Sequence, residues 1–235
     1  IHIKTDVLHI SIDPRSATVS SAKLLKYYTA VGEAKSPMSI LSSRSATSNQ
    51  QYVLTNKLYE NGAPLGVTYT AAKSEYVMKP SQKTMVVDLT ARHNGLVIDK
   101  KFTFTQGKYS VDVKTSVANN SKSTVNLQQG YGIVRSQPKT NRLHFNGASY
   151  SAGSEDYTKL SYSKMDKNNL NLNTNSGWVA MQQHYFLSTW IPPQKQSQQF
   201  YTKVDTKDGQ NYTIGSMLNF SLTPNQTLSR HATFY

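Results

Sequence analysis

The histidines of this sequence are the first candidates for chemistry, because imidazole binds metals and transfers protons near neutral pH. No two of them have the HExxH spacing that places two imidazoles on one face of a helix as zinc ligands. The chain also has no cysteine, which excludes disulfides, cysteine-ligated zinc and thiol catalysis. The sequence therefore predicts neither a metal site nor a bound cofactor. The six histidines are His2, His9, His93, His144, His184 and His231.

Motifs for nucleophilic and acid–base catalysis are also missing. Gly147–Ser151 reads GASYS, which is not the GxSxG of a serine nucleophile elbow. Gly130-Tyr131-Gly132 lacks the third glycine and the following helix of a dinucleotide loop, so a hairpin or a closely packed strand explains it better. Glu155 and Asp156 are neighbours, whereas glycosidase carboxylates face each other across a cleft. The sequence predicts a protein that is not an enzyme.

The most aromatic stretch of the chain is SGWVAMQQHYFLSTWIPP, residues 176 to 193, which contains both tryptophans. Glutamines and a histidine interrupt it and two prolines close it, so it does not have the roughly 20 apolar residues of a membrane-spanning helix. We expect a turn at Gly177, short strands at Trp178–Met181 and Phe186–Ile191, and a core position for the aromatic residues. The alternative is a ligand cleft lined by these side chains. The aromatic residues in question are Trp178, Tyr185 and Trp190.

The net charge of +13 raises the question of an anionic partner. The 26 basic residues are spread along the chain, and Lys100-Lys101 is their only adjacent pair. Nucleic-acid recognition usually shows a basic cluster or a named motif. We therefore predict no nucleic-acid partner, and regard the anionic surface of a membrane as the more plausible attraction.

The elements that must position these residues are strands, because period-two alternation of apolar and polar residues recurs along most of the chain. Short polar turns such as His93-Asn94-Gly95 separate them, and Met85 to Val134 predicts a four-stranded antiparallel meander. Residues 136–176 are polar and predicted to be rich in loops. Many short strands favour a β-sandwich, here a single domain over residues 1–235. The longer strands are predicted at Thr5–Ile12, Ala17–Tyr27, Gly66–Ala71, Met85–Arg92, Val97–Thr105, Ser110–Asn119, Val125–Val134, Ser197–Asp205, Asn211–Leu222 and Thr227–Tyr235.

Four segments of the chain are distinctive: TDVLHISID near the start, FTFTQGKYSVDVKTSVANNS from Phe102, FNGASYS from Phe145 and the aromatic stretch from Ser176. Together they resemble the large periplasmic domain of bacterial insertases of the YidC/Oxa/Alb family. The resemblance covers essentially the whole chain in order, with little to match between Ser42 and Glu75. It implies an all-β fold, a mutarotase-like β-supersandwich of mainly antiparallel strands with little helix.

The same resemblance implies a function. The chain would be a fragment of a larger Gram-negative inner-membrane protein, projecting into the periplasm as a monomeric, non-catalytic domain. The whole protein would insert and fold nascent membrane proteins as a chaperone, alone or with the periplasmic parts of the Sec translocon. Because tyrosine is enriched at interfaces, we expect partner contacts in the tyrosine-bearing region at Tyr150, Tyr157 and Tyr162. The alternative is a secreted carbohydrate- or peptide-binding sandwich.

Overall fold

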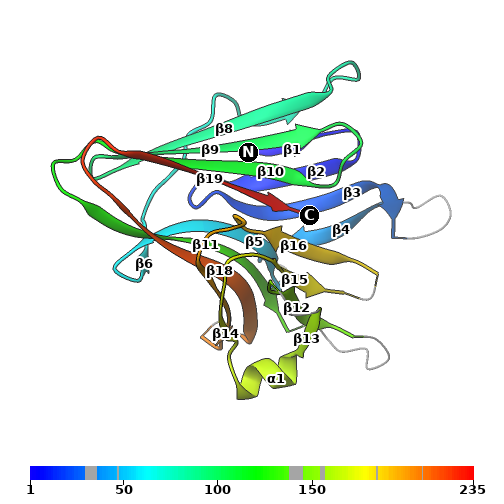
Figure 1. Ribbon diagram of the computed structural model, residues 1–235. Coiled ribbons are helices and arrows are strands. Elements are labelled where there is room, and N and C mark those ends of the chain that lie inside the picture. The colour runs from blue at the N-terminus through cyan, green and yellow to red at the C-terminus, as the bar shows by residue number, and fades with distance from the viewer. Residues whose placement is uncertain (30–35, 47, 138–144, 154–156, 184, 208) are drawn as a thin grey trace.

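The computed structural model describes residues 1–29, 36–46, 48–137, 145–153, 157–183, 185–207 and 209–235. Two bent sheets pack face to face, and the smaller one lies in front in Figure 1. The larger sheet has eleven strands. In spatial order they are β14 (Asn171–Thr174), β17 (Gln198–Asp205), β18 (Asn211–Leu222), β11 (Val125–Ser136), β5 (Tyr52–Glu60), β4 (Pro37–Ser42), β3 (Thr18–Tyr28), β2 (Leu8–Asp13), β1 (His2–Lys4) and β7 (Glu75–Val77), with β6 (Ala63–Pro64) beside β5.

The smaller sheet has eight antiparallel strands. One α-helix is present in the described part of the chain, α1 (Tyr162–Lys167). Ser161 caps its N-terminus, and the Ser161 Oγ accepts a hydrogen bond from the Lys164 amide at 3.3 Å. In order, the strands are β13 (Thr158–Ser161), β12 (Gly147–Ser151), β15 (Trp178–Gln182), β16 (Leu187–Ile191), β19 (Thr227–Phe234), β10 (Val111–Asn119), β9 (Leu96–Thr105) and β8 (Thr84–His93).

The core lies between the two sheets because alternate side chains of each strand point inward. In β2, Leu8, Ile10 and Ile12 are buried and the residues between them are half-exposed, as the alternation predicts. The centre of the core is aromatic: the Trp190 ring lies 5.2 Å from that of Tyr131 and 5.3 Å from that of Phe234. These three side chains join the two sheets, since Tyr131 belongs to the larger sheet.

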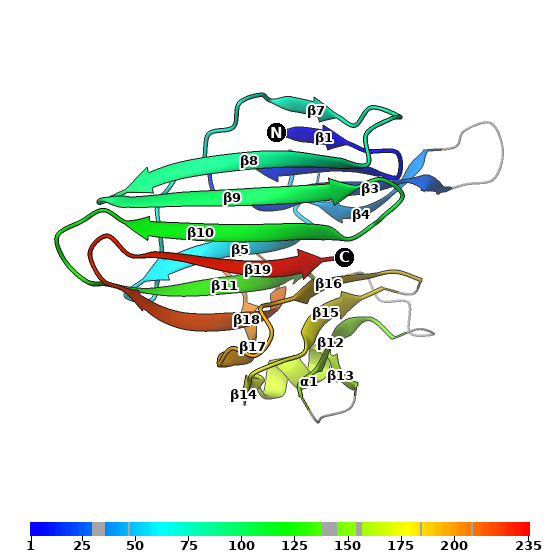
Figure 2. The same ribbon diagram turned by 45° about the horizontal axis from the view of Figure 1, so that its top comes forward.

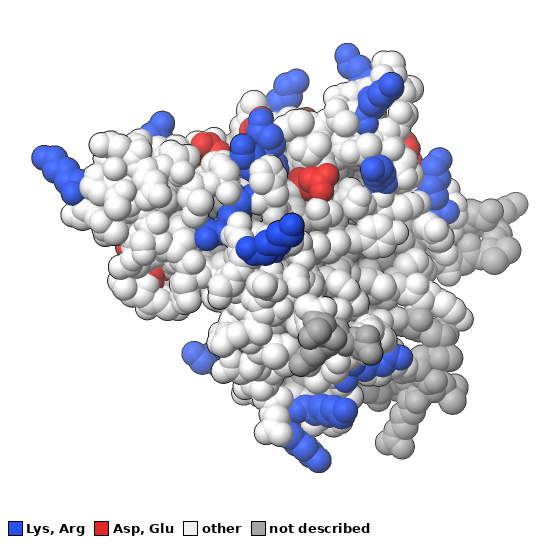
Figure 3. All heavy atoms as spheres, viewed as in Figure 1, with Lys and Arg blue, Asp and Glu red and all other residues white. Residues whose placement is uncertain are grey.

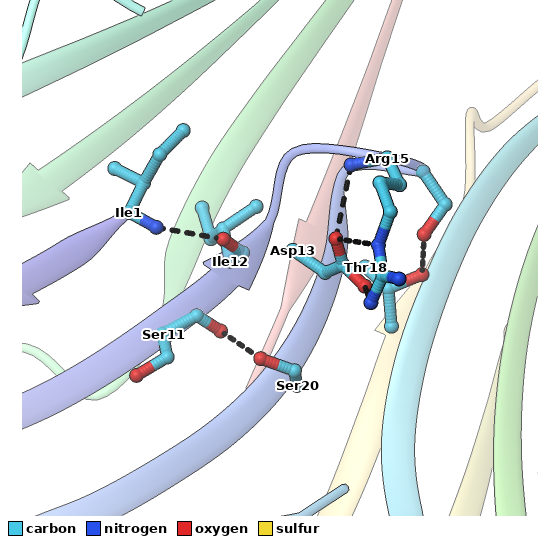
Figure 4. A network of polar contacts seen from close by, with 8 residues as sticks. Ile1, Ser11, Ile12, Asp13, Arg15, Thr18 and Ser20 are labelled. Atoms are coloured by element: carbon cyan, nitrogen blue, oxygen red, sulfur yellow. Dashed lines mark hydrogen bonds and ion pairs between the residues drawn. The ribbon is translucent and has the colours of Figure 1, made fainter. Parts of the chain in front are cut away.

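The turn between β2 and β3 shows how polar contacts hold one strand connection (Figure 4). Asp13 Oδ1 accepts hydrogen bonds from the Arg15 amide at 3.0 Å and from Arg15 Nε at 3.1 Å, and Asp13 Oδ2 pairs with Arg15 Nη2 at 3.0 Å. The backbone nitrogen of Ile1 donates to the Ile12 carbonyl at 3.0 Å. The turn itself spans residues 14–17.

The predicted four-stranded meander is wrong at its fourth strand. Strands β8, β9 and β10 are consecutive neighbours, but β10 pairs next with β19, and β11 lies in the other sheet between β5 and β18. An alternating pattern is the same in either sheet, and residues 120–124 are enough to cross between them. Gly130-Tyr131-Gly132 therefore lies in a closely packed central strand, not in a hairpin.

Two further predictions differ from the structure. Residues 66–71 form no strand: the Tyr69 amide donates to the Pro14 carbonyl at 2.7 Å, and Thr70 makes an isolated bridge to Thr90. The described part of the region 136–176, predicted to be rich in loops, also contains β12, β13, α1 and β14, which the sequence did not predict. Strand β12 is made of small and polar residues, yet it is largely buried between β13 and β15.

The two packed sheets confirm the predicted all-β sandwich of mainly antiparallel strands. In the ranges that the structure describes, no helix has the length and apolar character needed to cross a bilayer.

Candidate interaction surface

The hairpin of β15 and β16 places the two tryptophans in different surroundings. Gly177 precedes it with a φ of +116°, and a Cβ there would lie 1.9 Å from the Ser151 carbonyl oxygen, so the turn needs glycine. Trp190 is buried in the core and its Nε1 donates to the Gly132 carbonyl at 3.2 Å. Trp178 is half-buried and stacks on Tyr157, with ring centroids 5.9 Å apart. The predicted aromatic residues therefore do not line one common cleft.

The three tyrosines predicted to contact a partner differ in their exposure to solvent. Tyr150 and Tyr162 are buried, and the Tyr162 ring packs 4.4 Å from that of Tyr212. Tyr157 is exposed, and its hydroxyl donates to Gln182 Oε1 at 2.8 Å. A direct contact through the rings of Tyr150 and Tyr162 is excluded by this burial, and a contact through Tyr157 stays a prediction.

An apolar groove of about 290 Å³ opens at one end of the sandwich, between the two sheets. Its floor comes from the larger sheet, where Leu8, Leu24 and Ile40 lie in β2, β3 and β4. Figure 2 shows that the ends of β3, β4 and β16 and the C-terminal residue lie at this same end. We call this feature the aromatic groove.

Aromatic side chains from distant parts of the chain form its walls. The Tyr27 ring makes edge contacts with Tyr109 and Phe186, each with centroids 6.0 Å apart. Burial, and then the neighbouring Tyr27, raise the pKa of Tyr109 above its ordinary value, so its hydroxyl stays protonated at neutral pH. At the rim, Tyr185 is 80% exposed and Leu187 is 42% exposed. No Lys, Arg, Asp, Glu or His lines the groove within the described residues.

A lysine in the core is the residue that sequence reasoning missed. Lys100 is fully buried at an inward position of β9, where its Nζ donates to the Asn56 carbonyl and lies 5.1 Å from the centre of the Tyr69 ring. Burial, and then the nearby charge of Lys57, lower the pKa of Lys100 to about 7. The alternation of β9 could have revealed it, because Ile98, Lys100 and Phe102 share one face.

Amide side chains complete the polar network around this lysine. Gln129 Nε2 donates to Asn56 Oδ1 at 2.8 Å, and Asn56 Nδ2 contacts Thr115 Oγ1 at 3.4 Å. All of these side chains are buried between the sheets. A neutral amine is a nucleophile, but this one has no access to a substrate, and we assign it a structural role.

On the face of the smaller sheet, the charged side chains are dispersed, as the sequence predicts. On the face seen in Figure 3, Lys and Arg side chains are scattered over the smaller sheet with Asp and Glu between them. One such pair is Lys101 and Asp88, whose Nζ and Oδ1 are 3.4 Å apart. This face therefore shows no single basic stripe of the kind that tracks a nucleic-acid backbone. Among the residues that can be described, no three His, Cys, Asp or Glu side chains gather as metal ligands.

Solved structures of low sequence identity share the fold. A galactose mutarotase-like protein from Lactobacillus casei has a TM-score of 0.60 at 9% identity, covering 100% of this chain and 98% of its own. A putative aldose 1-epimerase from Escherichia coli K12 has a TM-score of 0.57 at 8% identity, covering 99% and 97%. These similarities confirm the mutarotase-like supersandwich and say nothing more about this chain.

Sequence relatives identify the family. The family model described as the YidC periplasmic domain matches residues 1–235. The membrane protein insertase YidC of Coxiella burnetii (strain Dugway 5J108-111) is 35% identical over 246 residues, covering 100% of this chain and 43% of that protein. That of Legionella pneumophila (strain Corby) is 35% identical over 232 residues, covering 92% and 40%. The chain thus spans less than half the length of these relatives, and it belongs to the YidC periplasmic domain family, the periplasmic part of bacterial membrane protein insertases.

Proposed function

We propose that this chain is a non-catalytic accessory domain of an insertase that helps inner-membrane proteins to insert and fold. The observation that carries the proposal is the family match over residues 1–235, together with relatives named as membrane protein insertases. Insertion by the whole protein is part of the proposal, because this chain covers 43% of such a relative.

The aromatic groove supports a role in recognition. Its described lining offers rings and aliphatic side chains, and three of its tyrosines, Tyr27, Tyr185 and Tyr235, are exposed. Such a mixture of apolar area and tyrosine is typical of the centre of protein–protein interfaces. Contiguous exposed apolar surface of this kind usually marks an interaction site. We propose that the groove takes an apolar segment from a periplasmic part of the Sec translocon.

Site-specific photo-crosslinking in the full-length protein tests this role. A photoreactive amino acid at Leu187 reports on the rim of the groove, and the same residue at Val86 is the control, because Leu187 and Val86 are 42% and 41% exposed. Val86 lies in β8, on the far edge of the smaller sheet. A third probe at Tyr157 tests the other predicted contact.

We expect adducts with a translocon subunit from position 187 and none from position 86. If the probe at position 187 forms adducts with a stalled nascent membrane protein and not with a translocon subunit, the groove binds the substrate and the translocon assignment is wrong. Equal adducts from 187 and 86, or none from 187, would contradict the proposal.

A further inference from the structure

A polar hollow of about 460 Å³ lies on the outer face of the larger sheet, away from the core and from the aromatic groove. Its volume is within the range of about 300–1,000 Å³ that small-molecule sites occupy. Four adjacent strands form it: β5, β11, β18 and β17. Their outward side chains line the hollow, because the alternate ones are used by the core.

Two tyrosine rings lie on glycines at the floor of this hollow. A Cβ on Gly130 would be 2.9 Å from Tyr59 Cε2, and a Cβ on Gly215 would be 2.9 Å from both Cζ and the hydroxyl oxygen of Tyr201. The Tyr201 hydroxyl also reaches to 3.7 Å from where a Cβ of Gly132 would be. Each ring therefore rests one face on the backbone of a neighbouring strand, and each tyrosine is half-buried, which leaves the other face toward the hollow.

Both tyrosine hydroxyls are available to a ligand. Within the described ranges, neither the Tyr59 nor the Tyr201 hydroxyl has a hydrogen-bond partner in the protein. Desolvation raises the pKa of each of them, so both hydroxyls are protonated donors at neutral pH.

The walls carry an excess of positive charge. Arg44, Lys57 and Lys203 line the hollow together with a single carboxylate, that of Asp205. Asp205 Oδ1 already accepts the Lys207 amide at 3.0 Å. In the part of the chain that the structure describes, neither Lys57 nor Lys203 forms an ion pair. The hollow is therefore suited to a ligand with negative charge.

An extended peptide fits this site poorly, because the strands below it have no free backbone groups to offer. Gly132 pairs with Thr55 on one side and Gly215 on the other, and Gly215 pairs in turn with Tyr201. Peptide capture by strand addition needs an open edge. Recognition here must come from side chains alone.

Flat aromatic faces, hydroxyl donors and cations together match one chemical class. The C–H groups on one face of a pyranose pack on an aromatic ring, its hydroxyls exchange hydrogen bonds with tyrosines, and a carboxylate pairs with lysine. We propose that this hollow binds an acidic saccharide, with Tyr59 and Tyr201 beneath the sugar and Lys203 on its carboxylate, while Lys57 adds positive charge from the opposite strand of the hollow. The site does not depend on the proposed insertase role.

Titration of isotope-labelled chain by NMR tests the proposal. The probes are a glucuronic acid–glucose disaccharide, the neutral disaccharide cellobiose, and AMP as an anion that stacks without a pyranose. We expect millimolar binding of the acidic disaccharide, with shifts confined to residues such as Thr55, Tyr201 and Thr213. Cellobiose should bind about tenfold more weakly. Equal binding of AMP would show a general anion site and overturn the saccharide assignment.

Two variants separate the contacts. Lys203→Gln should weaken the acidic disaccharide about tenfold and leave cellobiose unchanged, and Tyr201→Phe should weaken both by removing one hydroxyl. Lys101→Gln, on the smaller sheet, is the matched control and should bind as the original chain does. The same spectra report whether each variant is folded. Absence of shifts in the folded original chain, or an equal effect of Lys101→Gln and Lys203→Gln, would refute the site.

Discussion

Lys100 is held in the core with no carboxylate beside it in the part of the chain that the structure describes. The nearby charge of Lys57 disfavours its protonation, and the neutral Tyr69 ring favours it only weakly through a cation–π contact. The Asn56 carbonyl accepts its hydrogen bond. Burying an unpaired ammonium is unfavourable, so the protein responds by lowering the pKa until the amine is partly neutral near pH 7.

This environment predicts a stability that rises with pH. The unfolded chain keeps the proton up to the ordinary pKa of 10.5 and the folded chain releases it near 7, so between these values the unfolded state binds more protons. The free energy of unfolding should then rise by at most about 1.4 kcal/mol per pH unit across this window. Lys100→Met should remove the rise and stabilise the chain at the acidic end.

Urea unfolding at a series of pH values measures the free energy of unfolding of the variant and of the original chain. The difference between the two reports on Lys100 alone, because the titration of the tyrosines is common to both and cancels. Lys101→Met is the control, because that side chain is about half-exposed at 52%. A pH slope that survives in Lys100→Met would mean that another group causes it.

At the residue scale, the sequence predicts best where local geometry limits the choice. Gly177 is predictable because the turn before Trp178 requires a conformation that favours glycine, and the structure has φ at +116° there. The burial of Tyr150 and Tyr162 is not predictable in the same way. Their neighbours in sequence are polar. Tyr150 is covered because β12 pairs with distant β15, and Tyr162 is covered because it packs on Tyr212 of β18.

At the scale of elements, the connection from β10 to β11 decides which sheet each strand joins. Asn119 ends β10 and is fully buried. Its Nδ2 donates to the Ser123 carbonyl at 2.8 Å and to the Leu222 carbonyl at 2.9 Å, and its Oδ1 accepts the Ser121 amide at 3.0 Å. One amide thereby ties the end of a smaller-sheet strand to β18 in the larger sheet.

Replacing this amide should loosen the crossing between sheets. Asn119→Ala removes the hydrogen bonds to the Ser123 and Leu222 carbonyls and those from the Ser121 amide and hydroxyl, and we expect a loss of about 3 kcal/mol in the free energy of unfolding. Asn120→Ala, at the exposed neighbouring position, should change it by less than about 0.5 kcal/mol. Chemical denaturation of both variants checks this, and equal stabilities would show that the crossing does not need the Asn119 side chain.

Some elements can be predicted from the sequence and others cannot. Strand β2 is predictable because its apolar residues alternate with polar ones. Strands β15 and β16 are predictable because Gly177 precedes the first and Pro192 follows the second. The fourth meander strand is wrong because alternation indicates a strand but not its neighbours. The hollow on the outer face escapes prediction for a related reason: Tyr59 and Tyr201 lie far apart in sequence, and only the order of strands brings them to one face.

At the scale of the molecule, the net charge is +13, and on the face of the smaller sheet the basic side chains are scattered and form no single patch. Each basic residue near an anionic lipid surface contributes about 1 kcal/mol, and this attraction is screened by salt. A dispersed pattern places few of these residues at the surface at once. The chain should therefore associate with anionic membranes weakly and through charge alone.

Co-sedimentation with lipid vesicles tests this expectation. We expect retention on phosphatidylglycerol vesicles at low ionic strength, loss at physiological ionic strength, and none on neutral phosphatidylcholine. Binding that ignores salt would contradict it, and would point instead to insertion of the apolar rim of the aromatic groove.

The position of β19 sets the order in which the sandwich can be completed during export. This strand pairs with β10 over eight residues and with β16 at Trp190 and Ile191, so it joins the two halves of the smaller sheet. It is also the last strand of the chain. A chain that emerges into the periplasm from its N-terminus must therefore hold two open strand edges until residues 227–234 arrive. In that interval these edges are open to pairing with other strands, and slowing the arrival of the last strand should raise aggregation more than an equal delay earlier in the chain.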